Sequence, residues 1–314
     1  MFSIINKRKI WFILSGTLVL ASVIIFFVYG LKLGIDFTGG SLLEVEFSIN
    51  QPQIAEINQA LTDLNLGNII IQPVGEKGMI LRFKDIDEET HQKIIATLKE
   101  KFKPTDVIQT DQAGINFEVK VLEEKRFDSV GPVIGEELKR KTIWAIIIVL
   151  IAIVLYIAWA FRKVSKPVAA WKYGLIAVLA LFHDITITIG VFVLLGKLYG
   201  LEANAPFVAA LLTVLGYSVN DTIVVFDRIR ENLIRRMGDD FDKIVDQSIN
   251  EVIVRSINTS FTVLLALLAI LIFGGASIRD FVLALIIGIT VGTYSSIFLA
   301  SPLLVVWEKI RTKK

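Results

Sequence analysis

Two carboxylates interrupt long apolar stretches of this sequence. Asp221 lies in GYSVNDTIVVFDRIREN, residues 216–232, and Asp184 follows His183 in LFHDITITIG. On insertion scales a charged side chain at the centre of a bilayer costs at least about 3 kcal/mol, so an ionisable residue there is a functional hypothesis by default. A carboxylate that alternates between a protonated, desolvated state and an ionised, paired state can take up and release protons. We therefore predict that Asp221, with Asn220 beside it, belongs to a proton relay.

The alternative for Asp221 is a static ion pair or hydrogen bond that holds helices together. The relay is favoured because carboxylates inside membranes mark ion pathways more often than structural contacts. For Asp184 and His183 both interpretations stay open, since a buried histidine is frequently only a satisfied hydrogen bonder. Asp227 and Arg228 fall at the predicted membrane edge, where a charged side chain costs little free energy. We interpret them as signals of membrane topology.

The composition indicates an integral membrane protein. Hydrophobic residues make up 54% of the 314 positions and the mean hydropathy is +0.64, which is too apolar for a chain with a water-facing surface. A helix needs about 20 apolar residues to cross the hydrocarbon core. Six segments come near that length, approximately 10–31, 143–161, 173–195, 206–226, 257–273 and 281–307.

Basic residues predict the orientation of these segments. Lysines and arginines gather on one side, at 7–9, 162–172, 228–236 and 309–314. The positive-inside rule makes this the cytoplasmic side, so we expect both termini inside and a first span that remains as an uncleaved anchor. The long segment after it, 34–138, then lies outside. It has 19 acidic and 10 basic residues, in keeping with that side.

Short alternating patterns replace the long apolar runs in the external segment. Residues 41–47, 68–74, 79–83 and 115–122 read as strands, and residues 51–64 and 88–102 have apolar positions at helical spacing. The order β-α-β-β-α-β is that of the ferredoxin-like split motif. We therefore expect a polytopic α-helical membrane protein with six spans and one external α+β domain of this type.

These assignments divide the chain into three parts. Residues 1–33 contain the N-terminus and the first span, 34–138 form the external domain, and 139–314 contain the other five spans. Within the last part, segment 228–255 is amphipathic, and we expect it to lie along the cytoplasmic interface. It ends at Arg255, just before a polar cluster, Asn258, Thr259, Ser260 and Thr262, at the start of the fifth span.

A stripe of small residues marks the sixth predicted span. The stripe recurs at every fourth position and consists of Ala284, Gly288, Gly292, Ser296 and Ala300. Such a stripe lets another helix backbone approach closely, so we predict helix packing at this face. Whether the neighbouring helix belongs to this chain or to another subunit is left open by the pattern.

The residues give little support for a metal site, a cofactor, nucleic-acid binding or proteolysis. The chain has no cysteine, only two histidines and no phosphate-binding loop, so we expect no metal site and no cofactor. The basic residues flank membrane segments, which gives no basis for nucleic-acid binding. An intramembrane aspartyl protease that uses Asp184 and Asp221 as a catalytic pair is the alternative from another class. Against it, Val219 and Asn220 precede Asp221 where that family typically has Gly-x-Gly.

Four motifs in chain order resemble the SecF family of bacterial protein-export membrane subunits. They are GIDFTGG at 34–40, VGPVIGEEL at 130–138, the Asp221 segment, and FGGASIRDF at 273–281, and together they cover essentially the whole chain. The resemblance implies an RND-type half that pairs with SecD in the bacterial cytoplasmic membrane. It also implies that the chain acts with the SecYEG channel on exported unfolded preproteins. The proton-motive force would drive this transport, and the chain would have no enzymatic activity.

The same resemblance implies roles for individual residues. Asp221 matches the family's proton-linked aspartate, and Arg255 matches the basic residue at the start of the fifth span, which makes it a candidate cationic partner. The second essential carboxylate of that scheme belongs to SecD, so this chain is expected to hold only part of a proton path. We do not expect a complete small-molecule exporter of the RND type, because one six-span half provides no second repeat.

The glycines of the first motif have a structural interpretation. Gly34, Gly39 and Gly40 are expected to allow a tight turn between the first span and the external domain, with Asp36 and Thr38 capping or hydrogen-bonding locally. A hinge at this motif is the hypothesis.

Overall fold

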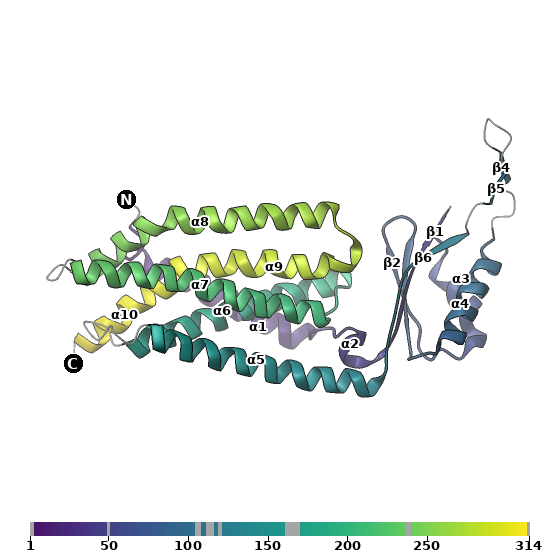
Figure 1. Ribbon diagram of the computed structural model, residues 1–314, viewed down its shortest axis with the longest axis horizontal. Helices are drawn as coiled ribbons and strands as arrows, with labels where there is room; N and C mark the ends of the chain where they lie inside the picture. The colour runs from purple at the N-terminus through teal and green to yellow at the C-terminus, as the bar shows by residue number, and fades with distance from the viewer. Residues whose placement is uncertain are drawn as a thin grey trace. The chain divides into compact units, whose positions relative to one another are not determined.

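The computed structural model describes residues 3–48, 51–103, 108–110, 116–118, 121–160, 170–235 and 240–312. The chain divides into two compact units (Figure 1). Met1–Lys32 and Thr142–Lys314 form a helical unit, and Leu33–Lys141 form an external domain that contains the sheets.

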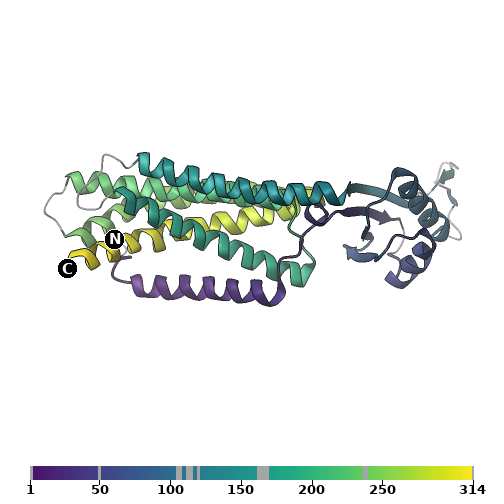
Figure 2. The same ribbon diagram turned by 90° about the horizontal axis from the view of Figure 1, so that it is seen from below.

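Six helices of the described chain are long and apolar enough to cross a membrane. Their elements are α1 (Arg8–Tyr29), α5 (Pro132–Ala160), α6 (Ala170–Tyr199), α7 (Ala205–Arg235), α8 (Phe241–Phe273) and α9 (Ala276–Ser295). The sixth helix continues from α9 through a π-helical turn, Ser296–Ala300, into α10 (Ser301–Thr312). The six predicted spans are thus confirmed. Both ends of the chain lie at the same end of the helical unit (Figures 1 and 2).

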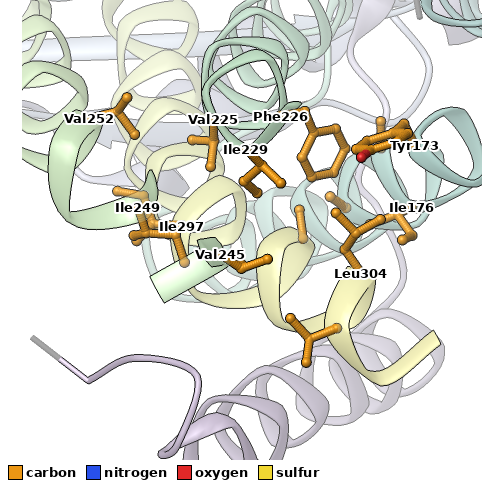
Figure 3. Close-up of a cluster of buried hydrophobic side chains, with 14 of the residues drawn as sticks. Tyr173, Ile176, Val225, Phe226, Ile229, Val245, Ile249, Val252, Ile297 and Leu304 are labelled. Atoms are coloured by element: carbon orange, nitrogen blue, oxygen red, sulfur yellow. The ribbon is translucent and has the colours of Figure 1, made fainter. Parts of the chain in front are cut away.

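The helices differ in how much of their surface this chain covers. About half of the apolar segment is buried in α6, in α7 and in the α9–α10 helix, whereas α1, α5 and α8 are mostly exposed. α9 packs along α7, and α1 packs along α6. Apolar side chains from α6, α7, α8, the π-helical turn and α10 converge in one buried cluster, drawn in Figure 3. The two intramembrane carboxylates lie among these same helices.

The described residues of the amphipathic segment 228–255 belong to two long helices, α7 and α8. α7 continues through its first part to Arg235, and α8 begins at Phe241 and runs on without glycine or proline. Ile229, Val245 and Ile249 are fully buried in the cluster of Figure 3. A position along the cytoplasmic interface stays a prediction for this segment, because an apolar face at helical spacing fits a neighbouring helix as well as it fits lipid.

In the external domain, four antiparallel strands form a sheet in the order β2-β3-β1-β6. The strands are β1 (Gly40–Phe47), β2 (Ile70–Val74), β3 (Gly78–Phe83) and β6 (Leu122–Val130). Two helices, α3 (Ile54–Leu61) and α4 (Glu88–Lys101), cover one face of the sheet (Figure 1). Leu43, Val45 and Phe47 alternate toward these helices and are buried. This is the predicted ferredoxin-like arrangement.

The last strand of the sheet is displaced from its predicted position at 115–122. β6 pairs with the whole of β1, from Gly40 opposite Val130 to Phe47 opposite Leu122. Residues 116–118 form β5 instead, which pairs with β4 (Ile108–Thr110), while 115, 119 and 120 lie outside the described residues. The sequence of β6, LEEKRFDSV, contains five charged residues. An edge strand tolerates them because much of it faces water, and the alternation that marks a buried strand is therefore weak.

Candidate functional site

Asp221 lies where three helical elements meet. It belongs to α7 and is 9% exposed. Its Oδ1 accepts a hydrogen bond of 2.7 Å from Ser256 Oγ on α8, and its Oδ2 accepts one from Ser296 Oγ at the start of the π-helical turn. Two hydroxyl donors from two other helices therefore hold the carboxylate.

The small-residue stripe explains how Ser296 reaches Asp221. A Cβ atom built on Gly288 would lie 2.3 Å from Val214 Cγ2, and one on Gly292 would lie 3.0 Å from Ser218 Cβ. These contacts repeat at four-residue steps along α7 and α9, so the two backbones run close together. The neighbour that the sequence left open is therefore α7 of this chain.

Asp184 forms a second polar centre on α6 and is fully buried. His183 Nδ1 lies 2.8 Å from its Oδ1. Its Oδ2 accepts hydrogen bonds from Ser218 Oγ at 2.5 Å and from Ser295 Oγ at 2.8 Å. The carboxylate is thus held by α6 itself, α7 and α9. Ser295 and Ser296 are consecutive residues that donate to different carboxylates.

A layer of hydroxyl groups continues the polar region between α7, α8 and α9. Tyr217 OH donates to Ser260 Oγ at 3.1 Å, and Ser260 Oγ lies 2.6 Å from Thr293 Oγ1. Tyr217 precedes Asp221 by about one helical turn, and Ser260 follows Ser256 by the same interval. The hydroxyl groups therefore extend the hydrogen-bonded region beyond the carboxylates themselves.

Arg255 and Asn220 do not share the buried position of Asp221. Both side chains are exposed on this chain, and among the described residues the donors to the Asp221 carboxylate are Ser256 and Ser296. The reason is helix geometry, because consecutive residues point about 100° apart. Ser256 and Asp221 face the neighbouring helices, so Arg255 and Asn220 turn toward the surface of the unit.

Sequence reasoning missed three of the residues that touch the carboxylates. Ser218, Ser256 and Ser295 donate to Asp184 or Asp221, and Ser296 was predicted only as a packing residue. The available signal was weak. A serine in an apolar helix often bonds to its own backbone, and its sequence position does not tell the two uses apart.

The two aspartates do not form the shared pair that an aspartyl protease needs. Each carboxylate has its own donors, and the hydrogen bonds of the described residues include none between Asp184 and Asp221. The part of the chain that the structure describes also contains no group of three or more metal-binding side chains. The arrangement can hold two carboxylates through hydrogen bonds from hydroxyl groups, within apolar surroundings.

The glycine motif in the external domain forms a close contact. Gly39 and Gly40 have φ angles of +73° and +117°, and a Cβ on Gly39 would lie 2.9 Å from Pro132 Cα. A Cβ on Gly135 would in turn lie 3.1 Å from the Gly39 nitrogen. The first two sequence motifs, 34–40 and 130–138, therefore meet in one backbone contact at the start of α5.

The residues before the glycine pair form a single turn of helix, α2 (Ile35–Thr38). Gly34 precedes it in an extended conformation, and Asp36 lies in its first turn. Thr38 Oγ1 donates to Gly34 O at 3.1 Å, which is the local hydrogen bond expected for Thr38. A hinge at this motif stays a prediction, since the contact with Pro132 lies within the external domain.

Comparison with known proteins connects these features. The family model of the protein export membrane protein SecD/SecF, C-terminal, matches residues 111–310, and the SecD/SecF GG motif matches residues 24–48. The protein translocase subunit SecF of Thermobaculum terrenum is 42% identical, over 98% of this chain and 94% of the relative. The protein of the same description from Anaerolinea thermophila is 40% identical, with the same coverage of 98% and 94%.

A solved structure is similar over nearly the whole chain. The crystal structure of SecDF, a translocon-associated membrane protein from Thermus thermophilus, superimposes with a TM-score of 0.78 and 32% sequence identity. The match covers 98% of this chain and 39% of the solved chain. This chain therefore spans about two fifths of the length of that protein.

Proposed function

Because the chain belongs to the SecF family of protein translocase subunits, we propose that it helps to drive protein export by coupling it to the proton-motive force. In this proposal the chain is a transport subunit and not an enzyme. It acts with SecD, next to the SecYEG channel, on unfolded preproteins that cross the cytoplasmic membrane. Asp221 is the group that takes up and releases the proton.

The surroundings of Asp221 support this role. The carboxylate is 9% exposed in a helix long enough to cross a membrane, and its hydrogen-bond donors are the neutral hydroxyls of Ser256 and Ser296. A permanent arginine pair would favour the ionised form, whereas hydroxyl groups can serve either protonation state. A carboxylate in such a place can change its charge without leaving a bound cation unpaired.

The exposed side chains next to the site support a partner at this surface. Asn220 and Arg255 lie beside Asp221 and Ser256 in sequence and are exposed on this chain. A cationic and an amide side chain facing bare lipid would be costly. We infer that SecD covers this face, and that Arg255 pairs with Asp221 only in part of the transport cycle.

Exchange of one carboxylate tests the proposal. In vesicles reconstituted with SecD and the channel, Asp221→Asn should reduce export to the level measured without a proton gradient. The reason is that an amide side chain does not bind a proton near neutral pH. Asp227→Asn is the matched control. Asp227 lies on the same helix, is exposed and contacts Arg230 at 3.4 Å, so its exchange should leave export unchanged. Export that still responds to the gradient in Asp221→Asn would refute the relay.

Orientation in the membrane can be tested separately. The basic flanks favour cytoplasmic termini, and both termini lie at one end of the helical unit. Because the chain has no cysteine, a single introduced thiol reports one position. In spheroplasts, a membrane-impermeant maleimide should label Glu76→Cys in the external domain and should not label Ser3→Cys. The reverse labelling would place the termini outside.

A further inference from the structure

The sixth helix changes its winding where it meets the two carboxylates. Ser295 is the last residue of α9, and Ser296 is the first residue of the π-helical turn. Ser295 Oγ donates to Asp184 Oδ2 at 2.8 Å, and Ser296 Oγ donates to Asp221 Oδ2. One pair of neighbouring residues therefore touches carboxylates on two different helices. π-Helical turns are frequent at functional sites.

Each of these serines also has an acceptor within its own helix. Ser296 Oγ lies 3.0 Å from the carbonyl oxygen of Thr293, and Ser295 Oγ lies 3.1 Å from that of Gly292. A serine hydroxyl has one hydrogen and two lone pairs, so it donates in only one direction at a time. Each hydroxyl can therefore donate either to its carboxylate or to its helix carbonyl.

The protonation state of the carboxylate decides between these two directions. An ionised carboxylate only accepts hydrogen bonds, whereas a protonated one also donates one. When Asp221 binds a proton, its new O–H donates to Ser296 Oγ, and the Ser296 hydroxyl turns to the Thr293 carbonyl. When the proton leaves, the hydroxyl turns back. No covalent bond of the serine changes, and neither state leaves a buried polar atom without a partner.

We propose that Ser295 and Ser296 are paired hydroxyl switches that keep Asp184 and Asp221 satisfied in both protonation states and link the two carboxylates through the π-helical turn. The inference rests on the proposed function, because it assigns the residues that make proton exchange at Asp221 possible. It also gives Asp184 a part in that exchange. Ser295 and Ser296 are positioning residues, since they act through the carboxylates.

The other ionisable groups near the switch belong to the helices packed around it. His183 on α6 contacts Asp184, and the ring of Tyr294 on α9 lies 6.2 Å from that of His183. Arg255 on α8 is exposed beside Ser256. On α10, Glu308 pairs with Lys172 and Lys309 pairs with Asp242. On α1, Arg8 lies 3.6 Å from Asp242.

A pH profile of proton-driven export tests the switch in the complex with SecD and the channel. Ser295→Ala and Ser296→Ala each remove a partner of both protonation states, but the hydrogen bond to the ionised carboxylate is the stronger one, so each variant should displace the profile by about one pH unit toward higher pH. Ser296→Cys keeps a weaker donor and should give a smaller displacement. Thr188→Val is the matched control, because this buried hydroxyl donates to the backbone oxygen of Asp184 and its loss should leave the profile unchanged.

Infrared difference spectra test the link between the carboxylates. The band of protonated Asp221, assigned by its loss in Asp221→Asn, should shift when Asp184→Asn is introduced. That shift should disappear in the double variant Ser295→Ala/Ser296→Ala. An equal shift with and without the serines would refute the link.

The outcomes separate this inference from the proposed function. If wild-type export responds to the gradient while both alanine variants keep the wild-type pH profile, the switch is refuted and the relay at Asp221 stands. If wild-type export does not respond to the gradient, the proposed function fails first. Copurification of each variant with SecD checks that the alanine variants fold, and the band positions remain measurable in any variant that copurifies.

Discussion

Among the described residues, the helical unit buries carboxylates and the external domain buries none. In the domain the main cluster, which includes Leu43, Leu81 and Leu98, is apolar, and the charged residues of β6 lie at an edge. In the helical unit Asp184 and Asp221 are buried, and glycines bring α7 and α9 together around them. The hydrophobic effect drives the packing of the apolar cluster in the domain. Within lipid, close contact and internal hydrogen bonds must replace that driving force.

Truncation of the domain core should have the largest effect on stability. Leu81 is fully buried and lies opposite Leu43 across β3 and β1. Leu81→Ala should lower the free energy of unfolding of the domain by about 2–5 kcal/mol through lost burial and a cavity. Hydrogen exchange of β1 and β3 in the full chain measures it. Ile80→Ala, on the open face of the sheet, should cost less than about 1 kcal/mol. Equal effects would show that the sheet has no single buried face.

Overpacking of the α7–α9 crossing tests the other mode of packing. Gly288→Ala places a methyl group 2.3 Å from Val214 Cγ2 in the present geometry. It should destabilise the helical unit by about 1–3 kcal/mol, measured by thermal unfolding in detergent. Gly216→Ala is the matched helical control, with no heavy atom within 4 Å. It should be neutral or stabilising by about 0.5–1 kcal/mol. If both variants were equally stable, the crossing would not depend on close contact.

The glycine motif gives a test of backbone strain within the external domain. Gly40 has a φ angle of +117°, and a Cβ there would lie 2.8 Å from Phe83 O. Gly40→Ala should cost about 1–3 kcal/mol in domain stability because of backbone strain. Gly75 also has a positive φ, +62°, but open space around it, so Gly75→Ala should cost less. Unfolding of the two variants is compared by hydrogen exchange at β1 and β3. Equal protection would argue that Gly40 can move away from Phe83.

The smallest effect is expected at a helix end on the domain surface. Hydrogen bonds from Thr90 to the Asp87 carboxylate, at the start of α4, hold the pKa of Asp87 below its ordinary value of 3.8. A lowered pKa in the folded state stabilises the domain above that ordinary value, and the contribution is lost as the pH falls through the lowered pKa. Asp87→Ala should lower the melting temperature by a few degrees at neutral pH.

Repetition of the Asp87→Ala melting experiment in acid checks the sign. The difference between wild type and variant should shrink as the pH falls below 3.8, the ordinary value for this carboxyl group. Asp63→Ala, at a 3₁₀ turn without a capping hydrogen bond, is the matched surface control. A difference for Asp87→Ala that persists unchanged in acid would mean that the carboxylate does not stabilise α4 through its charge.

Prediction from the sequence succeeded where one local pattern determined the result. The membrane helices, β1, β3 and α4 follow from apolar runs or from regular alternation. It failed at β6, whose charged sequence hides an edge strand. The deciding contact there was with β1, an element distant in the sequence.

At the candidate site the same division holds. The cost of placing a charge in lipid is sufficient to single out Asp184 and Asp221 from their positions in apolar segments. The serines could not be assigned, because a hydroxyl in a helix can bond to its own backbone or across to a neighbour. Arg255 was expected near Asp221, and helix geometry turns it to the surface while Ser256 takes that place.

The sequence by itself determined the membrane class, the six spans, the external domain and the family motifs. It also determined the two carboxylates that are costly to place in lipid. Each of these depends on composition or on spacing within one segment. Only the tertiary structure decided that the small-residue stripe packs on α7 and that Ser295 and Ser296 divide between Asp184 and Asp221. The physical reason is that hydrogen bonds and close contacts form between helices, and the rotation of each helix about its axis is set by all its neighbours together.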